Sequence, residues 1–480
     1  MLFNSIEFAI FLPIVFLLYW FVFNKNLKLQ NLFVVVVSYI FYGWWDWRFL
    51  FLIAFTSACS FAAGLLIDKF RENQRKARVI NALNIIINLL ILGVFKYYDF
   101  FVSSFADLFL GGKDDGLLLH LILPVGISFY TFQALSYSID VYKGKLEPTR
   151  DIIQFFAFVS FFPQLVAGPI ERATNLLPQF AKPRSFDYET GVDGLRQILW
   201  GLFKKMVVAD NCAVYVDNVF STYQTQSGST LLLAAIFFAF QIYGDFSGYS
   251  DIAIGTAKLF GIKLMRNFNV PYFSRDIAEF WRRWHISLTT WFRDYVYIPL
   301  GGSRCSKAKI ARNTFVIFLL SGFWHGANWT FIAWGAYHAL LFLPLILMGK
   351  NRKYRDTVAE DRASPTLKEF GQMLLTFILV VIGWIIFRAD SIGQAGDYLQ
   401  HMFSPSLFSI PWLFSRSFYI PLMVALSIMI CAEWFFRVDL SFRKFDRIPK
   451  TFRVLLYYML IAFMYIVAPA GNTQFIYFQF

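Results

Sequence analysis

Long apolar stretches alternate with short polar ones along nearly the whole chain, and this pattern predicts the main elements. Most of these stretches are long enough, or nearly so, to cross a hydrocarbon core of ~30 Å as an α-helix. We therefore predict an all-α, polytopic membrane protein with about 11–12 transmembrane helices. The predicted spans lie near residues 6–23, 30–46, 48–67, 79–97, 117–139, 152–168, 229–260, 314–347, 369–387, 417–436 and 453–469.

Proline and glycine interrupt several spans, as in "LPVGISFYTF" and "FFPQLVAGPIER". Irregular backbone at membrane depth is tolerated only where it is buried in protein or lines a cavity. We therefore expect re-entrant or pocket-lining pieces at these places. The chain has no visible internal repeat and no soluble segment of domain size, so residues 1–480 are predicted to form one polytopic domain.

The composition supports a membrane protein, because 58% of the 480 residues are hydrophobic and only 16% are charged. A soluble fold would leave much of this apolar surface in water, which costs roughly 25 cal/mol per Å². The net charge of +13 comes from short Lys and Arg clusters between apolar stretches, so it indicates membrane topology rather than nucleic-acid binding. The four cysteines lack the spacing of a disulfide framework or a zinc site.

The basic clusters predict which ends of the spans face the cytoplasm. They are Lys25 with Lys28, "KFRENQRKAR" (69–78), "KNRKYR" (350–355) and "FRKFDRIPKTFR" (442–453), and the positive-inside rule makes them cytoplasmic. Both termini are then extracytoplasmic, and residues 453–480 form the last span and an outer tail that ends in "FIYFQF". The first apolar stretch lacks a basic leader and a cleavage site, so it is expected to be retained.

Polar residues inside apolar spans are expensive, which makes them candidates for function. The stretch "QIYGDFSGYSDIAIG" (241–255) carries Asp245, Ser247 and Ser250. One interpretation is a hydrogen-bonded packing network, with Gly244 and Gly248 forming a close helix contact. The other is that these side chains line a cavity.

The stretch "EFWRRWHISLTTWFRDYVYIPLGGSR" (279–304) combines apolar residues at helical spacing with several arginines. Its pattern predicts an amphipathic segment that lies along the membrane interface. Its arginines suit either a phosphate-bearing ligand or lipid headgroups. His285 lies on the apolar side, where a lone histidine is more often structural than catalytic.

The stretch "LLSGFWHGANWTFIAWGAYHALL" (319–341) places His325 in the middle of a predicted span. Trp324 precedes it, and Asn328 is predicted to lie on the same helix face three residues later. A neutral imidazole in a dry cavity accepts a proton from a hydroxyl group, as a general base does. No HExxH motif or GxSxG elbow is present, so neither a metal site nor a serine hydrolase is indicated.

These motifs together resemble one family. The "EFWRRWHISLTTWFRDYVYIPLGG" and "SGFWHGANWTFIAWGAYH" segments are similar to the central signature of the membrane-bound O-acyltransferases (MBOAT). The opening "MLFNSIEFAIFLPIVFLLYW" and the "SYIFYGWW", "LPVGISFYTFQALSYSIDVYKG" and "YGDFSGYSDIAIG" segments resemble its bacterial branch, which acetylates alginate or peptidoglycan. The resemblance covers nearly the whole chain.

The resemblance implies the MBOAT fold, in which spans, re-entrant helices and interfacial helices surround a central cavity. It implies transfer of acetyl from cytoplasmic acetyl-CoA, the donor substrate, without a permanently bound cofactor or metal. His325 becomes the principal active-site residue and His285 the second. Four arginines become candidates for binding the CoA phosphates: Arg282, Arg283, Arg293 and Arg304.

The closing "FIYFQF" is similar to the C-terminal motif of the small partner protein in teichoic acid D-alanylation. By that resemblance Tyr477 accepts acetyl with His325 as base, and a separate SGNH-type protein outside the bacterial inner membrane passes it to a polysaccharide. The alternative for the tail is anchoring, with Phe475, Phe478 and Phe480 at the lipid interface. The alternatives for the whole protein are a transporter or flippase of a glycan intermediate, and an acyltransferase acting on lipid or protein.

Overall fold

A computed structural model describes residues 1–111, 116–439, 441–469 and 476 of the chain. All regular elements among these residues are helices, as the sequence pattern predicts. Two apolar helical segments, Ile6–Val22 and Leu27–Gly43, are shorter than a full span. Seven of the described helices are long and apolar enough to cross a membrane: Trp47–Lys69, Gln74–Phe109, Gly228–Leu259, Trp329–Leu347, Leu367–Arg388, Arg416–Phe436 and Lys450–Val467.

The described residues form two compact units. The first unit contains residues 1–198 and 252–265, and the second contains residues 199–251 and 266–480. The boundary falls inside two helices, α9 and α11, so no polar linker in the sequence indicates it. The single domain that the sequence predicts stays a prediction.

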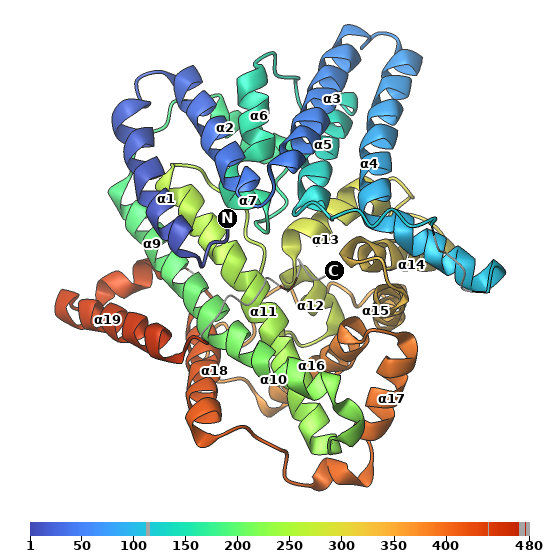
Figure 1. The fold of residues 1–480 in the computed structure, drawn as a ribbon, viewed down its shortest axis with the longest axis vertical. Helices are drawn as coiled ribbons and strands as arrows, with labels where there is room; N and C mark the ends of the chain where they lie inside the picture. Colours follow the sequence, from blue (N-terminus) through green and yellow to red (C-terminus); the bar gives the residue numbers. More distant parts are fainter. Residues whose placement is uncertain (112–115, 440, 470–475, 477–480) are drawn as a thin grey trace. The chain divides into compact units, whose positions relative to one another are not determined.

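The first unit is built mainly from α2 to α6, with α3 packed against both α4 and α5 (Figure 1). α5 begins only at Ile127, so the predicted span at 117–139 is shorter than expected. α6 and the short α7 break at Phe161, as the proline after it predicts. The elements of this unit are α1 (Ile6–Leu17), η1 (Leu18–Val22), α2 (Leu27–Gly43), η2 (Trp47–Phe49), α3 (Leu50–Lys69), α4 (Gln74–Phe109), α5 (Ile127–Tyr142), α6 (Ile152–Ser160), α7 (Phe162–Leu165), α8 (Ala173–Phe180) and most of α9 (Tyr188–Leu202).

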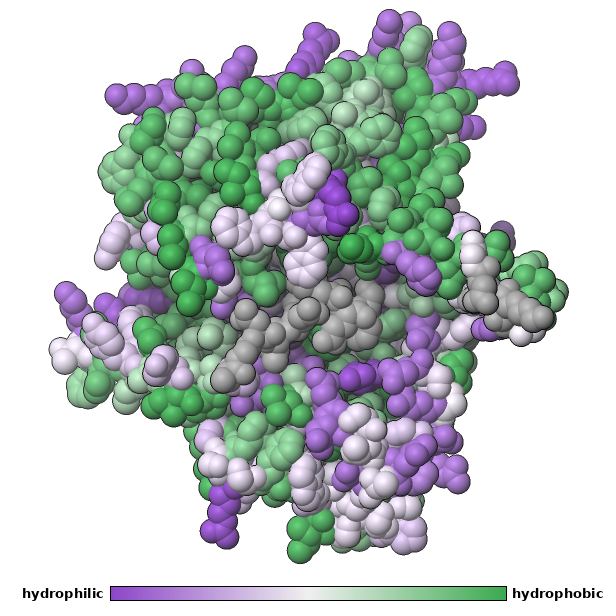
Figure 2. Space-filling view, viewed as in Figure 1, coloured by the Kyte–Doolittle hydropathy of each residue, from purple (hydrophilic) through white to green (hydrophobic). Residues whose placement is uncertain are grey.

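Hydrophobic side chains cover the outward surface of α2, α3 and α4, as Figure 2 shows. Large apolar residues such as Phe51, Leu90 and Phe101 are exposed there. Charged side chains gather at the ends of α3 and α4, where the exposed residues 71–76 connect the two helices. An apolar surface that stops at a charged connection is the pattern expected of helices that cross a bilayer.

The second unit is built around a hairpin of α14 and α15, against which α16 packs (Figure 1). Gly322 and Gly335 allow the two helices of the hairpin to approach closely. A Cβ atom on Gly322 would lie 2.1 Å from the carbonyl oxygen of Phe331, and one on Gly335 would lie 2.4 Å from that of Phe318. The elements of this unit are the end of α9, η3 (Phe203–Ala209), α10 (Asp210–Ser221), η4 (Tyr223–Thr225), most of α11 (Gly228–Leu259), η5 (Pro271–Phe273), α12 (Ile277–Arg283), α13 (Ile286–Phe292), η6 (Arg293–Tyr297), α14 (Lys307–His325), α15 (Trp329–Leu347), α16 (Leu367–Arg388), α17 (Ile392–Met402), η7 (Pro405–Phe408), α18 (Arg416–Phe436), η8 (Phe442–Arg447) and α19 (Lys450–Val467).

The prediction that residues 279–304 lie along the membrane interface is wrong for the first half of this segment. α12 and α13 are two short helices that meet at His285, and most of their side chains are buried. Their apolar spacing reflects contacts with α11, α14 and α15 on several sides rather than with lipid on one. Only the following residues 293–304 are largely exposed or half-buried.

Candidate active site

His325 is the last residue of α14 and is buried. The sequence places it in the middle of one long span, which is wrong, because the backbone becomes extended at Gly326 and α15 begins at Trp329. Glycine permits this break, since a Cβ atom at position 326 would lie 2.1 Å from the ring of Phe331. The imidazole therefore lies at a helix end, inside the α14–α15 hairpin.

Asn328 does not share a helix face with His325, because the helix ends between them. Its side-chain oxygen accepts a hydrogen bond from the backbone N–H of Thr330 at 3.0 Å and caps α15. Its Nδ2 donates to the carbonyl of Asp390. Asn328 thus fixes the start of α15, and its place in a cavity wall stays a prediction.

Aromatic rings surround the imidazole of His325. Its ring centroid lies 5.0 Å from Trp324, 5.2 Å from Trp334 of α15 and 5.3 Å from Phe387 of α16. Three helices of the second unit therefore fix its position. An uncharged imidazole is the form that accepts a proton.

His285 lies between α12 and α13 in the left-handed backbone region, with φ at 42°. Its Nδ1 is 3.0 Å from Oδ1 of Asn267, and its ring packs on Phe246 of α11 at 4.6 Å. The side chain is buried, and burial lowers the pKa of His285 to about 3. The ring is therefore neutral at any physiological pH.

Trp324 connects the two histidines. Its indole centroid is 5.7 Å from the His285 ring and 5.0 Å from the His325 ring. The structure therefore brings together two residues that are 40 positions apart in the chain and come from different helices. Two imidazoles beside one indole, in an interior of aromatic side chains, suit proton transfer from a hydroxyl group.

The polar residues of α11 form a charged packing network in the second unit. Nζ of Lys205 lies 2.7 Å from Asp245 and 2.8 Å from Asp210, and all three side chains are buried. Gly244 and Gly248 lie directly against the backbone of η3 and the end of α9, as the packing interpretation predicts. Burial of an ion pair costs desolvation, so the cluster needs the close geometry that these glycines allow.

Ser250 is linked to His285 through Asn267. No hydrogen bond between Ser247 and His285 is present among the described residues. Oγ of Ser250 accepts a hydrogen bond from Nδ2 of Asn267 at 3.2 Å, and Asn267 in turn contacts His285. Ser247 is buried on the same helix. The cavity-lining role of either serine stays a prediction.

The C-terminal segment reaches this network through Ile476. Its backbone N–H donates to Oδ2 of Asp245 at 2.7 Å, and Ile476 is only 2% exposed. Asp245 is followed in α11 by Phe246, which packs on His285. Tyr477 itself, and Phe475, Phe478 and Phe480, lie outside the described residues.

The four arginines predicted to bind phosphate have different environments. Arg282 donates to the backbone carbonyls of Asn351 and Tyr354. Arg283 pairs with Glu279 at 2.9 Å and also donates to the carbonyl of Asp356.

These two guanidinium groups therefore already bind the basic loop after α15. Arg293 forms an ion pair with its neighbour Asp294 at 2.6 Å, and Arg304 is exposed. A phosphate would share or replace the acceptors of the first two arginines, and their role in CoA binding stays a prediction.

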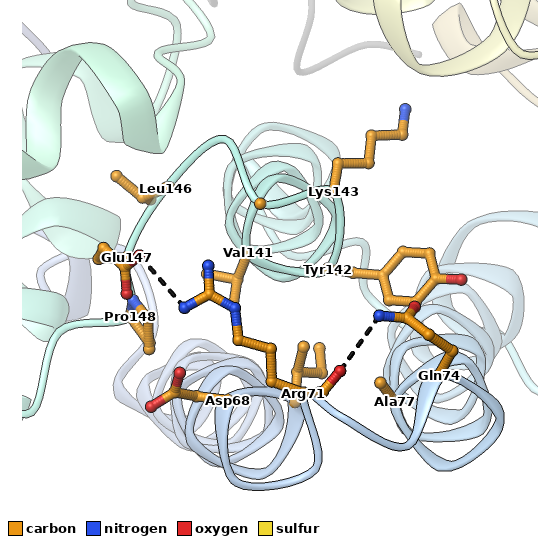
Figure 3. Close-up of a pocket in the computed structure, with 12 residues that line it drawn as sticks. Asp68, Arg71, Gln74, Ala77, Val141, Tyr142, Lys143, Leu146, Glu147 and Pro148 are labelled. Atoms are coloured by element: carbon orange, nitrogen blue, oxygen red, sulfur yellow. Dashed lines mark hydrogen bonds and ion pairs between the residues drawn. The ribbon is translucent and has the colours of Figure 1, made fainter.

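A surface pocket of about 190 Å³ lies in the first unit, at the ends of α3, α4 and α5 (Figure 3). Two acidic and two basic side chains line it: Asp68, Glu147, Arg71 and Lys143. Arg71 and Glu147 are 3.5 Å apart. The balanced charges do not favour an anionic ligand, and none of the predicted site residues lines this pocket.

Sequence reasoning missed Asn267 and Lys205. Asn267 lies in an irregular stretch 18 residues before His285, so neither helical spacing nor a motif connects them. Lys205 lies in the π-helix η3, next to Lys204 in the motif "FKKM". Two adjacent lysines within an apolar stretch were the available signal, because buried lysines in membrane proteins are normally paired.

Comparison with known proteins gives a consistent result. The sequence profile of the MBOAT, membrane-bound O-acyltransferase family matches residues 148–381. The chain is 40% identical over 406 residues to the probable alginate O-acetylase of Pseudomonas aeruginosa, an alignment that covers 84% of this chain and 75% of that protein.

Two further relatives are named for other acyl-transfer activities. The chain is 36% identical over 431 residues to the peptidoglycan O-acetyltransferase of Helicobacter pylori, covering 84% of this chain and 80% of that protein. It is 29% identical over 282 residues to the teichoic acid D-alanyltransferase of Bacillus subtilis, covering 56% of this chain and 69% of that protein.

Proposed function

Because the chain belongs to the membrane-bound O-acyltransferase family, we propose that this multi-pass membrane O-acyltransferase transfers acetyl from cytoplasmic acetyl-CoA to polysaccharide hydroxyl groups outside the bacterial inner membrane. The names of the relatives support an acetyl group and a cell-surface glycan such as alginate or peptidoglycan. The family match and the names of the relatives favour an acyltransferase over the transporter alternative.

A sugar hydroxyl outside the membrane meets CoA on the cytoplasmic side only through a tunnel or a relay, and the proposal is a relay. In the proposed first step the phenol oxygen of Tyr477 attacks the thioester carbonyl of acetyl-CoA. The phenol proton passes to His325, and CoA leaves as the thiolate. A base is needed because a phenol with a pKa near 10 is mostly protonated at pH 7.

The second transfer takes acetyl from the aryl ester to the glycan. A separate extracytoplasmic SGNH-type protein accepts it on a serine hydroxyl, and the tyrosine regains its proton. The acetyl group then passes from the serine ester to a sugar hydroxyl. Both termini of the chain are placed outside the membrane in this scheme, as the basic clusters predict.

The contact between Ile476 and Asp245 is the observation that carries the proposal. It fixes the residue before Tyr477 in the second unit, one helix position from a residue that packs on His285. A tail that only anchors the protein in lipid has no need of a buried hydrogen bond to a carboxylate.

Arg293 and Arg304 are the two predicted phosphate ligands without carbonyl acceptors in the loop after α15, and we propose them first for CoA.

The test is to incubate purified protein with radiolabelled acetyl-CoA and to map the label by digestion. We expect label on the C-terminal peptide of the wild type and its loss in Tyr477→Phe. Tyr465→Phe is the matched control, because Tyr465 is 89% exposed on α19. His325→Ala is expected to abolish labelling while the protein still elutes as a folded species.

Label that persists in the Tyr477→Phe protein would remove the carrier role, and labelling by His325→Ala at the wild-type rate would remove the base. Loss of label in Tyr465→Phe to the same extent as in Tyr477→Phe would mean that the assay reports protein quality rather than a site.

A further inference from the structure

Asn267 is fully buried and faces the start of α13 with both of its oxygen atoms. Its backbone carbonyl accepts a hydrogen bond from the N–H of Ile286 at 2.8 Å. Its side-chain Oδ1 accepts from Ser287, from the backbone N–H at 3.3 Å and from Oγ at 2.8 Å. A single residue therefore satisfies two of the N–H groups that a helix start leaves without partners.

These contacts fix which side-chain atom of Asn267 is the oxygen. The backbone N–H of Ser287 is a donor in any protonation state, so the amide atom that faces it has to be an acceptor. The other end of the amide donates from Nδ2 to Oγ of Ser250 at 3.2 Å. A flipped amide would place two donors against each other, which excludes the alternative orientation.

The orientation of Asn267 determines the tautomer of His285. Nδ1 of His285 lies 3.0 Å from Oδ1, an atom that only accepts, so Nδ1 carries the hydrogen. In a neutral imidazole the other nitrogen, Nε2, then has the lone pair. Nε2 is the atom that can accept a hydrogen bond or a proton from a bound group.

Nε2 is buried and has no hydrogen-bond partner within the described part of the chain. The ring contacts Phe246, Phe268 and Trp324, and its polar neighbours are Asn267 and Ser287. None of these five residues is charged. An unpaired acceptor in an apolar interior is costly unless something else binds it.

We propose that Asn267 is a positioning residue that holds His285 as the Nδ1–H tautomer and so presents Nε2 as an acceptor for an O–H or N–H group of the bound substrates. The role of His285 in acyl transfer rests on the proposed function, whereas its tautomer does not. In this arrangement Ser250 accepts a hydrogen bond from the amide of Asn267, and Asn267 accepts one from the imidazole of His285. The backbone N–H groups at the start of α13 hydrogen-bond to Asn267 and fix its orientation.

The test measures the tautomer directly in the full-length protein, with no acetyl-CoA present. Histidine is labelled with ¹⁵N, and the His285 signals are assigned by their absence in His285→Gln, which is practical because the chain has only 5 histidines. We expect the wild type to show protonated Nδ1 and unprotonated Nε2. We expect Asn267→Ala to lose this preference, and Asn267→Asp to keep it because a carboxylate oxygen also accepts.

The same variants are then assayed for acetyl transfer. Loss of an orienting partner is expected to lower the rate at least about tenfold in Asn267→Ala, and less in Asn267→Asp. A wild-type signal with the hydrogen on Nε2 would overturn the proposal, and so would an unchanged tautomer in Asn267→Ala. If Asn267→Ala does not fold, the wild-type and Asn267→Asp spectra still decide.

The outcomes separate this inference from the proposed function. An Nδ1–H tautomer that depends on Asn267, in a protein that transfers no acetyl, would support the positioning role and contradict the proposed reaction. Acetyl transfer by a wild-type protein whose His285 carries its hydrogen on Nε2 would support the proposed reaction and contradict the positioning role.

Discussion

At the residue scale, His285 occupies a backbone conformation that a residue with a Cβ atom rarely adopts. A positive φ outside glycine is uncommon and costs about 1–3 kcal/mol where it is held. Here the conformation lets the chain turn between α12, which ends at Arg283, and α13, which begins at Ile286, and the imidazole packs in the aromatic interior. The hydrogen bonds from α13 to Asn267 offset the strain.

The low pKa of His285 predicts how stability depends on pH. The folded pKa is about 3, against about 6.5 for an exposed histidine. The unfolded chain therefore binds a proton first as the pH falls, so this contribution to stability is complete above about 6.5 and is lost progressively between about 6.5 and 3. We expect the midpoint of thermal unfolding of the detergent-solubilised protein to fall on acidification from pH 7 to pH 5.

The same measurement on His285→Gln is expected to show a smaller fall. His401→Gln removes an exposed histidine of α17 and is the matched control. If His285→Gln and the wild type lose stability in parallel, burial of this imidazole is not the cause.

The sequence makes the two histidines candidates, because each lies in a motif that resembles the family, and their roles stay predictions. The partner of His285 could not be predicted in the same way. Asn267 lies in an irregular segment, and its contact with His285 depends on how that segment packs beside α13. Contacts of this kind have no periodic signal in the chain.

At the element scale, the α14–α15 hairpin positions His325 because its two helices approach closely. Gly322 and Gly335 lie at this contact, where a Cβ atom would be 2.1 Å and 2.4 Å from backbone carbonyl oxygens of the opposite helix. The hydrophobic pattern of residues 314–347 has no feature that distinguishes one long helix from two. The break between α14 and α15 depends on Gly326, which lies directly against the ring of Phe331.

Gly322→Ala is therefore expected to destabilise the protein by about 1–3 kcal/mol, because backbone atoms cannot move aside as a flexible side chain does. Acetyl transfer should fall with it, since His325 ends the same helix. Gly371→Ala on α16 is the control: its Cβ atom would meet nothing within 4 Å, and it should leave the melting temperature unchanged or slightly higher. Equal melting temperatures for the two variants would contradict the close-contact argument.

At the scale of the whole molecule, the sequence predicts the class and most of the spans but not the division into two compact units. The length of an apolar stretch indicates whether a helix can cross the membrane, but it does not indicate which helices pack against each other. The buried charges of Lys205, Asp210 and Asp245 are an example. The sequence shows that polar residues lie within these apolar stretches, but only the fold pairs them with each other and with the C-terminal segment.

Asp245 is predicted to hold the tail through its side-chain oxygen. Asp245→Asn keeps an oxygen acceptor for the N–H of Ile476, whereas Asp245→Ala removes it, and both lose the ion pair with Lys205. We expect C-terminal labelling by acetyl-CoA to be about fivefold lower in Asp245→Ala than in Asp245→Asn, as for loss of one hydrogen bond to a neutral acceptor, worth about 1 kcal/mol. Melting temperatures measured in parallel correct for the shared loss of the ion pair, and identical labelling in both variants would mean that Asp245 does not hold the tail.

The hydrogen bond between Ile476 and Asp245 joins the end of the chain to its own interior. If the last residues carry the acetyl group, the carrier is never a second molecule that has to be recruited. Its effective concentration at the histidines is set by the length of chain between α19 and Ile476, and it does not change on dilution. The rate of the first transfer then depends on the concentration of acetyl-CoA but not on the concentration of any carrier.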